Sequence, residues 1–176
     1  MSRLHLPDLN QTITQYGEVQ QFLQGKGIHY ERWVLPVAVA PQADERTVLS
    51  AYGDFLTPYM KKNKYQTADV ICIREDMPQL PELKNKFLQE HTHSEDEVRF
   101  FVSGKGLFWF HIPDAPIFSV LCEAGDLLSV PAGIRHWFDM GEKPYVKVIR
   151  MFIDPQGWIA QYTNSQVETR YTEFSL

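Results

Sequence analysis

Three histidines and one glutamate have the residue types and the spacing of a metal site. The segment from His91 to Glu97 reads HTHSEDE, and a further histidine, His136, follows later in the chain. Histidine is the commonest metal ligand in proteins, and a carboxylate is its usual anionic companion. This pattern predicts that His91, His93, Glu97 and His136 bind one metal ion.

A strand would place these ligands on one side. Successive side chains of a strand alternate between its faces, so His91 and His93, two residues apart, project to the same face. Glu97 shares this parity and can complete the set whether the strand continues or folds back at the polar residues 94–96. His136 must come from another strand.

The ligand types restrict the metal. A closed structural zinc site is usually built with cysteine, which this set lacks. Mixed nitrogen and oxygen ligands suit Fe²⁺, Ni²⁺, Co²⁺ or Mn²⁺. Four protein ligands leave roughly two positions open on a six-coordinate ion, so we expect a substrate or oxygen to bind there.

Helices are predicted in the first ninety residues. Residues 16–25 have the apolar spacing of a short helix. A second helix is expected to begin after Asp44, which can cap it, and to end near residues 62–64, with Pro58 kinking or dividing it. Residues 80–90 predict a third helix.

Strands dominate from residue 91 onward, where turn residues separate short segments at regular spacing, as in a sandwich or barrel. The strand-like segments are 91–102, 106–112, 117–122, 126–130, 135–139 and 144–153. Gly104 and Gly106 suggest a tight hairpin between the first two. Two earlier segments also read as extended, 28–39 and the apolar 68–74, which we expect to be a buried strand.

Composition excludes some classes of protein. The chain has 176 residues, of which 44% are hydrophobic and 22% charged, as in an ordinary globular domain. The net charge of −5, with no dense basic run, argues against a nucleic-acid or membrane partner. No apolar segment suits a signal peptide or membrane span, so we expect a cytoplasmic protein. Cys72 and Cys122 lack motif spacing, so we expect reduced, buried and inert thiols.

The ligand spacing resembles that of the cupin superfamily. The run H-x-H-x3-E-x6-G, from His91 to Gly104, matches its first motif, and G-x5-P-x-G-x2-H, from Gly125 to His136, matches most of its second. The chain departs from the pattern at Asn85, where the first motif has glycine, and at Met140, where the second motif ends in asparagine. Neither position is a metal ligand in that superfamily.

The superfamily resemblance implies a mostly β fold, a cupin-type double-stranded β-helix (jelly-roll) barrel with two or three peripheral helices. We expect one domain over residues 1–176. Within it, residues 1–90 supply strands and helices that pack on the barrel, 91–153 form the metal-binding core, and 154–176 form a loop and tail. We expect a monomer, although an exposed strand edge could pair.

A closer resemblance, over roughly residues 80–160, is to the acireductone dioxygenases, metal-dependent enzymes of the methionine salvage pathway. It rests on three runs, HTHSEDEVRFFVSGKGLFWF, AGDLLSVPAGIRHWFDMG and VKVIRMFIDPQGWIA. The resemblance implies cleavage of acireductone by O2, with formate and 2-keto-4-methylthiobutyrate as products with Fe²⁺. With Ni²⁺ the implied products are formate, carbon monoxide and 3-methylthiopropionate. Co²⁺ and Mn²⁺ are candidate substitutes.

Two arginines and one acid are candidates for handling substrate charge and protons. Arg99 shares the parity of the ligands, and a buried arginine needs an anionic partner. The resemblance implies that Arg99 neutralises a bound enediolate; the alternative is a structural pair with an acid. Arg150, an isolated charge in an apolar strand, has the same two interpretations. Glu95 is a candidate base for the enediol proton, or else a solvated side chain.

Three aromatic residues are candidates for contacts with the substrate. The resemblance places Phe87, Phe138 and Trp158 at aromatic positions near the substrate pocket, although core packing would explain them equally well. Trp158 follows the loop-like residues 154–157, which could close over the site.

Two other functions stay open. The first is a different cupin dioxygenase or isomerase that acts on another metal-chelating substrate, since the barrel supports many chemistries. The second is a non-enzymatic cupin that stores metal or senses a ligand. Oxygen uptake on defined substrates would separate these functions.

Overall fold

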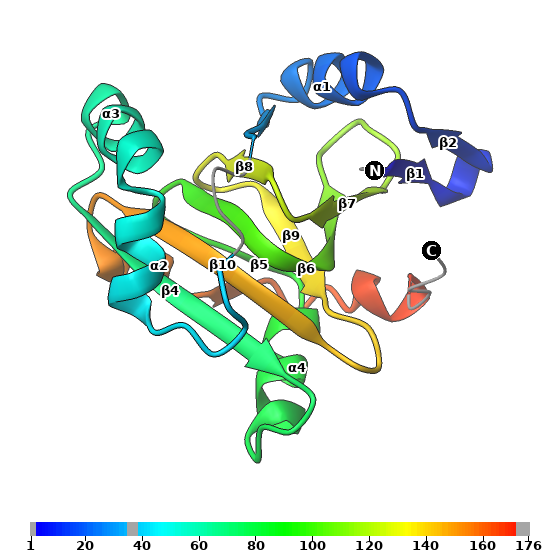
Figure 1. Ribbon diagram of the computed structural model, residues 1–176. Coiled ribbons are helices and arrows are strands. Elements are labelled where there is room, and N and C mark those ends of the chain that lie inside the picture. The colour runs from blue at the N-terminus through cyan, green and yellow to red at the C-terminus, as the bar shows by residue number, and fades with distance from the viewer. Residues whose placement is uncertain (1–2, 35–38, 172–176) are drawn as a thin grey trace.

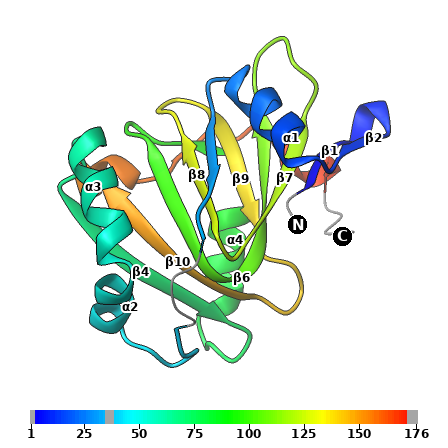
Figure 2. The ribbon, with the colours of Figure 1, turned by 45° about the horizontal axis from the view of Figure 1, so that its top comes forward.

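A computed structural model describes residues 3–34 and 39–171, and the strands of this part form a barrel of two joined sheets (Figures 1 and 2). The strands are β1 Arg3–Leu6, β2 Gln11–Ile13, β3 His29–Arg32, β4 Thr67–Arg74, β5 His91–Thr92, β6 Glu97–His111, β7 Phe118–Glu123, β8 Asp126–Val130, β9 Arg135–Asp139, β10 Tyr145–Phe152 and β11 Gln161–Tyr162. The helices are α1 Tyr16–Gln24, α2 Glu45–Ala51, α3 Gly53–Asn63 and α4 Leu80–Leu88. Three 3-10 turns complete the elements: η1 Pro7–Leu9, η2 Pro155–Trp158 and η3 Val167–Arg170.

Strand β6 belongs to both sheets. Its first part pairs with β8 and β10, and its second part pairs with β7 and β9, all antiparallel. One sheet has the order β11-β5-β9-β6-β7-β1-β2, and the other runs β4-β10-β6-β8-β3. The predicted mostly β barrel is therefore confirmed, and the four strands β1 to β4 from the first ninety residues are members of its sheets.

The predicted hairpin at residues 103–105 is wrong. The chain stays in β6 and bends at Gly104, whose φ is 76°, next to the point where the register with β10 shifts. A Cβ atom at Gly104 would lie 1.8 Å from the carbonyl oxygen of Tyr145, so a side chain cannot be accommodated. The glycine allows one strand to pass from one sheet into the other, rather than to reverse.

Apolar side chains fill the barrel and attach the helices to it. Buried residues of the interior include Phe101, Phe108 and Phe138. A second cluster holds α2 and α3 against the outer face formed by β4, β10 and β6, as Figure 1 shows on the left, with Tyr52 packed on Phe100 at 5.3 Å between ring centroids. The outer face of this sheet is thereby covered by α2 and α3.

The helices were largely predicted, with one difference. Residues 16–24 and 80–88 form α1 and α4 as expected, and the side chain of Asp44 caps α2 by accepting a hydrogen bond from the Thr47 amide at 2.8 Å. The expected long helix is divided at Tyr52, which leaves helical geometry (φ −105°, ψ 5°), and not at Pro58, which lies inside α3. The described residues therefore contain four α-helices, one more than expected.

The two early extended segments also differ from expectation. Only residues 29–32 of the expected segment 28–39 form a strand, and residues 35–38 lie outside the described part. Strand β4 was expected to be buried, but it is an edge strand that pairs only with β10, and most of its residues are half-buried. Cys72 on β4 is therefore half-buried, whereas Cys122 is buried as expected, and both thiols are free. No helix in the described ranges is long and apolar enough to cross a membrane.

Candidate metal centre

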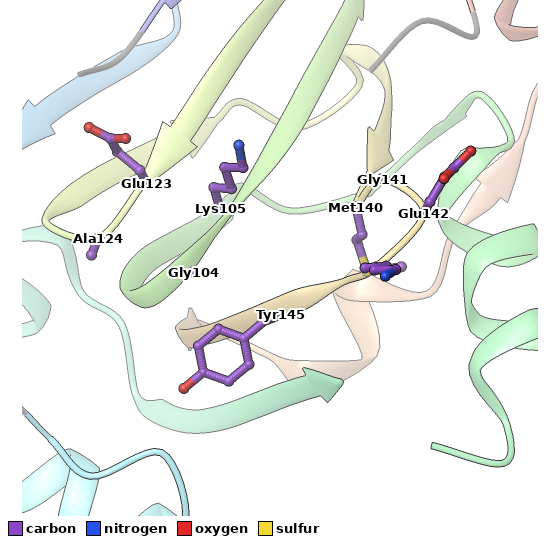
Figure 3. Close-up of a pocket in the computed structure, with 9 residues that line it drawn as sticks. Gly104, Lys105, Glu123, Ala124, Met140, Gly141, Glu142 and Tyr145 are labelled. Atoms are coloured by element: carbon purple, nitrogen blue, oxygen red, sulfur yellow. The ribbon is translucent and has the colours of Figure 1, made fainter. Parts of the chain in front are cut away.

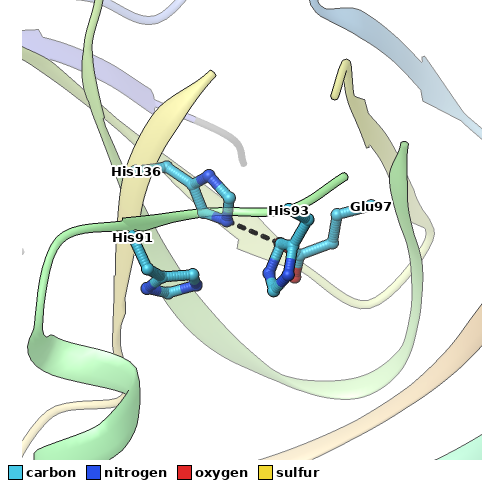
Figure 4. Close-up of side chains that lie close together, drawn as sticks. All are labelled: His91, His93, Glu97 and His136. Atoms are coloured by element: carbon cyan, nitrogen blue, oxygen red, sulfur yellow. Dashed lines mark hydrogen bonds and ion pairs between the residues drawn. The ribbon is translucent and has the colours of Figure 1, made fainter. Parts of the chain in front are cut away.

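The four predicted ligands converge on one buried point (Figure 4). His91 begins β5 and lies directly opposite His136 on β9, Glu97 begins β6, and His93 lies between β5 and β6. All four are at most 7% exposed, and one ligand atom from each lies within 4.8 Å of the others. Ligands at about 2.1 Å from a metal ion are about 3.0–4.2 Å apart when cis or trans, so the cluster has the dimensions of a metal site.

Backbone carbonyl groups orient two of the imidazole rings. Nδ1 of His91 lies 2.7 Å from the Gln89 oxygen, and Nδ1 of His136 lies 2.8 Å from the Ile134 oxygen. A carbonyl oxygen only accepts, so each Nδ1 carries the proton and each Nε2 keeps a lone pair. Burial, together with the nearby His136, lowers the pKa of His91 to about 4, which keeps this ring neutral and able to bind a metal at neutral pH.

The carboxylate of Glu97 faces two of these rings. Its Oε2 lies 2.6 Å from Nε2 of His136 and 3.3 Å from Nε2 of His93. Burial acts to raise the pKa of Glu97, but the charge of Arg99 and the contacts with His136 hold it well below its usual range. An ionised carboxylate and a nitrogen lone pair this close need a cation or a proton between them, so the donor set fits a divalent metal ion.

Arg99 lies beside the ligands, enclosed by aromatic rings. Its guanidinium group forms an ion pair through Nε with Oε1 of Glu97, and its side chain is 4% exposed. The carbon Cζ of Arg99 lies over four rings at 5.1–5.9 Å, those of Phe87, Phe108, Phe138 and Trp158. Burial lowers the pKa of Arg99, although Glu97 opposes this shift. Among the described residues, the buried Nη1 of Arg99 has no hydrogen-bond partner, so a donor is left for a ligand.

Arg150 lies next to Arg99 but is paired with a different carboxylate. The two arginines are directly opposite each other on β10 and β6. The guanidinium group of Arg150 makes two hydrogen bonds to Asp69 on β4, Nε to Oδ1 at 2.8 Å and Nη2 to Oδ2 at 2.5 Å. Sequence reasoning missed Asp69, yet a signal existed, because both residues are isolated charges within apolar strands that could pair.

Both acids between the ligands hold neighbouring segments. The chain bends at residues 94–96 instead of continuing as a strand. Oε2 of Glu95 accepts a hydrogen bond from the Asp154 amide at 2.9 Å, and Oδ1 of Asp96 accepts one from the Ala132 amide at 3.0 Å. Glu95 therefore has a structural partner that the sequence did not reveal, and its assignment as a base stays a prediction.

The three predicted aromatic residues do gather at the centre. Phe87 on α4 packs edge-on against Phe138 at 6.2 Å, and Trp158 at the end of η2 stacks on His93 at 5.9 Å. Sequence reasoning missed Phe108, whose ring lies 4.7 Å from that of Phe138. Phe108 sits on the far part of β6, so its approach to Arg99 depends on the bend of that strand.

Sequence reasoning also missed a buried acid next to the first ligand. Glu90 is 2% exposed, and its carboxylate lies 2.6 Å from Nδ1 of His111, 2.5 Å from the Thr163 hydroxyl and 2.8 Å from the Ser165 hydroxyl. These contacts fasten the segment that contains β11 to β5, which starts at His91. The sequence around His111 shows no partner for it, so its pairing with Glu90 emerges only from the fold.

A hollow of about 960 Å³ on the described surface is lined by none of the four ligands (Figure 3). It is lined by residues such as Gly104, Lys105, Met140 and Tyr145. On β9, the hollow begins just beyond one end of the strand, whereas His136 lies near the other end. The volume of a hollow therefore does not identify the candidate site, which lies at the histidine cluster.

A barrel of two antiparallel sheets with three histidines and one glutamate around a buried point defines a metal-binding cupin. The profile of the ARD/ARD' family matches residues 9–160, so this chain belongs to the ARD/ARD' family.

Curated relatives and a solved structure agree with this assignment. The chain is 47% identical over 176 residues to an acireductone dioxygenase of Picosynechococcus sp., with both chains fully covered. It is 49% identical over 159 residues to an acireductone dioxygenase of Gluconobacter oxydans, covering 90% of this chain and 84% of the relative. A Bacillus anthracis acireductone dioxygenase with a cadmium ion in its active centre superposes with a TM-score of 0.84 at 32% identity, covering 92% of this chain and 98% of that one.

Proposed function

We propose that this protein is an acireductone dioxygenase, which cleaves 1,2-dihydroxy-5-(methylthio)pent-1-en-3-one with O2. Membership of the ARD/ARD' family supports the reaction class. The observation that carries the proposal is the placement of Arg99, a buried cation beside the metal ligands with a free donor at Nη1 among the described residues. An enediol that loses its protons is an anion, and such a site suits an anion.

The residues around the metal site supply a positive charge, an apolar surface and protection from water. Arg99 holds the negative charge of the enediolate, an interaction that is strong in a site shielded from water. Phe87, Phe108 and Phe138 surround the guanidinium group, keep water away and offer an apolar surface for the methylthio tail. The guanidinium group of Arg150 lies over the ring of Trp158 and adds to the positive potential that attracts the anionic substrate. The negative charge of Asp69 offsets part of this potential.

A divalent metal bound by His91, His93, Glu97 and His136 supplies a Lewis acid for the oxygen atoms of the substrate. The Gln89 and Ile134 carbonyl groups keep two imidazoles in the tautomer that can bind it. We propose Fe²⁺ or Ni²⁺ as the native ion, with Co²⁺ or Mn²⁺ as substitutes, and the ion as the determinant of the products. The enzyme would serve methionine salvage in the cytoplasm, as a monomer.

Oxygen uptake with one metal at a time tests this function. Protein freed of metal is reloaded with Fe²⁺, Ni²⁺, Co²⁺ or Mn²⁺, mixed with freshly generated acireductone, and its products are identified. We expect formate and 2-keto-4-methylthiobutyrate with Fe²⁺, and carbon monoxide with formate and 3-methylthiopropionate with Ni²⁺. A failure to consume oxygen with every ion, at one bound ion per chain, would reject the enzyme and leave a metal-binding cupin.

A further inference from the structure

One 3-10 turn beside the metal centre is fastened at both of its ends. The turn η2, Pro155–Trp158, follows Asp154, whose amide donates to Oε2 of Glu95 at 2.9 Å. At the other end, the indole N–H of Trp158 donates to the carbonyl oxygen of Asp96 at 3.1 Å. Two consecutive residues of the ligand loop therefore hold the start and the end of the same turn.

The loop that holds the turn is itself fixed. Oδ1 of Asp96 accepts from the Ala132 amide at 3.0 Å, and the carbonyl oxygen of His93 accepts from the Gly133 amide at 2.9 Å. Glu95 and Asp96 lie between the ligands His93 and Glu97, so the metal centre adds a further restraint on the same segment. The loop that provides the attachment points for η2 is thus held by hydrogen bonds of its own.

Trp158 is the side chain that this turn positions. Its ring stacks on that of His93 at 5.9 Å with an interplanar angle of 28°, and it lies 4.5 Å from the ring of Phe152. On its outer side is a hollow of about 380 Å³, which Arg150 and Ile159 also line. The indole therefore stands between this hollow and the metal ligands.

We propose that Glu95 is a positioning residue that holds Trp158 over the metal centre through its hydrogen bond to the Asp154 amide. This role rests on the proposed function, because the dioxygenase reaction supplies the substrate that Trp158 would enclose at the metal centre. Asp154 continues the restraint into the turn, since its own Oδ1 accepts from the Gln156 amide at 2.9 Å. Loss of the Glu95 acceptor removes the hydrogen bond at the start of η2 and leaves the indole with its hydrogen bond to Asp96 and its ring contacts.

The chemistry of Glu95 separates positioning from proton transfer. An acceptor is all that the Asp154 amide requires, and a glutamine side chain also offers an oxygen of the same reach. A base must take up a proton, which an amide does not do. Glu95→Gln therefore keeps the proposed role and removes the role of base, whereas Glu95→Ala removes both.

Hydrogen exchange of peptides that cover residues 153–160 tests the attachment without any catalysis. We expect exchange at the Asp154 amide to be about tenfold faster in Glu95→Ala than in the parent, and unchanged in Glu95→Gln. Glu75→Ala, which changes an exposed acid after β4, is the matched control and should leave this segment unaltered. Unchanged exchange in Glu95→Ala would overturn the proposal, even if the chain had no dioxygenase activity.

Steady-state oxygen uptake supplies the second measurement. For Glu95→Ala we expect KM for acireductone to rise more than kcat falls, with one metal ion per chain retained, and for Glu95→Gln we expect KM to stay at the parental value. A fall of about 100-fold in kcat for Glu95→Gln, together with loss of one limb of the pH profile, would assign Glu95 as the base and overturn the positioning role.

Discussion

Arg99 and Arg150 face each other across β6 and β10, and both guanidinium groups lie over the ring of Trp158, at 5.9 and 5.4 Å. Only Arg150 has a carboxylate that is not part of the metal centre, since it is paired with Asp69. The ion-pair partner of Arg99 is Glu97, which is also a metal ligand. The two arginines are therefore neighbours with different ion-pair partners: Arg150 is paired with an acid on the edge strand β4, and Arg99 is paired with a metal ligand.

Removal of the Arg99 charge should separate binding of metal from turnover. For Arg99→Gln we expect kcat/KM to fall by about 100- to 1000-fold, because a charged donor in a dry site is lost, while one metal ion per chain stays bound. The measurement is oxygen uptake together with metal analysis. Arg74→Gln, which breaks an exposed pair with Asp76, is the control and should be close to neutral. Full activity of Arg99→Gln would return this residue to a structural role.

Loss of one ligand should abolish the metal site. For His136→Ala we expect metal affinity to fall by more than about 100-fold, because even residues that only support ligands typically contribute 10- to 100-fold. Isothermal titration with Ni²⁺ measures this effect. His29→Ala removes a histidine with a half-exposed side chain that pairs with Glu31, so it should bind Ni²⁺ like the parent. Equal affinity in both variants would exclude His136 from the site.

The contact between Gly106 and Phe138 should be intolerant of a methyl group. A Cβ atom at Gly106 would lie 2.1 Å from Cζ of Phe138, whose ring packs under Arg99. We expect Gly106→Ala to lower the free energy of unfolding by about 1–3 kcal/mol through overpacking, and to raise KM as the ring moves. Gly53→Ala meets nothing within 4 Å and provides the comparison in denaturant unfolding. Identical midpoints for the two variants would show that this close approach does not limit stability.

The buried Glu90 should be a point of weakness for the C-terminal segment. Glu90→Ala removes the acceptor for His111, Thr163 and Ser165, and we expect a loss of about 2–4 kcal/mol in the free energy of unfolding. Hydrogen exchange should show β11 opening before the rest of the barrel. Glu18→Ala, an exposed change on α1, should have no such effect.

Asp139 should make stability depend on pH. Burial raises the pKa of this carboxyl group, although its hydrogen bond from the Gly141 amide at 2.8 Å opposes the shift. Because the pKa of Asp139 is higher in the folded state, its contribution to the free energy of unfolding is largest below the unfolded pKa of about 3.9. That contribution is lost as the pH rises through the folded pKa. Asp139→Asn should therefore be more stable than the parent at pH 7, and the difference should shrink towards pH 4. Calorimetry of the two proteins at pH 4 and pH 7 measures this difference. A single unfolding transition in the same experiment would also support the expected single domain.

The sequence predicted the metal centre better than the fold that holds it. The ligands have a short, regular spacing, and parity in an extended chain is enough to bring His91 and His93 together. The bend in β6 was not predictable, because Gly104 and Gly106 suit a hairpin as well as a bent strand. The close approach of the Tyr145 carbonyl group and the Phe138 ring favours the bent strand over the hairpin, and both residues are distant from these glycines in the sequence.

The contacts of Glu95 and Glu90 were hidden for a related reason. Their partners, Asp154 and Ser165, come from segments with weak periodicity after the last long strand. A single sequence shows which residues can accept a hydrogen bond, but not which distant amide or hydroxyl group will reach them. Arg150 and Asp69 were the exception, because each is an unusual charge in its own strand.

The membership of β6 in both sheets also decides when the metal centre can exist. Glu97 lies where β6 pairs with β8, whereas His136 is on β9, which pairs with the far part of β6 and with β5 at His91. Both sheets must therefore have assembled before the four ligands meet. Pairings between segments so distant in the chain form slowly. Capture of the metal ion thus belongs to the final stage of folding, and its rate after dilution from denaturant would time the closure of the barrel.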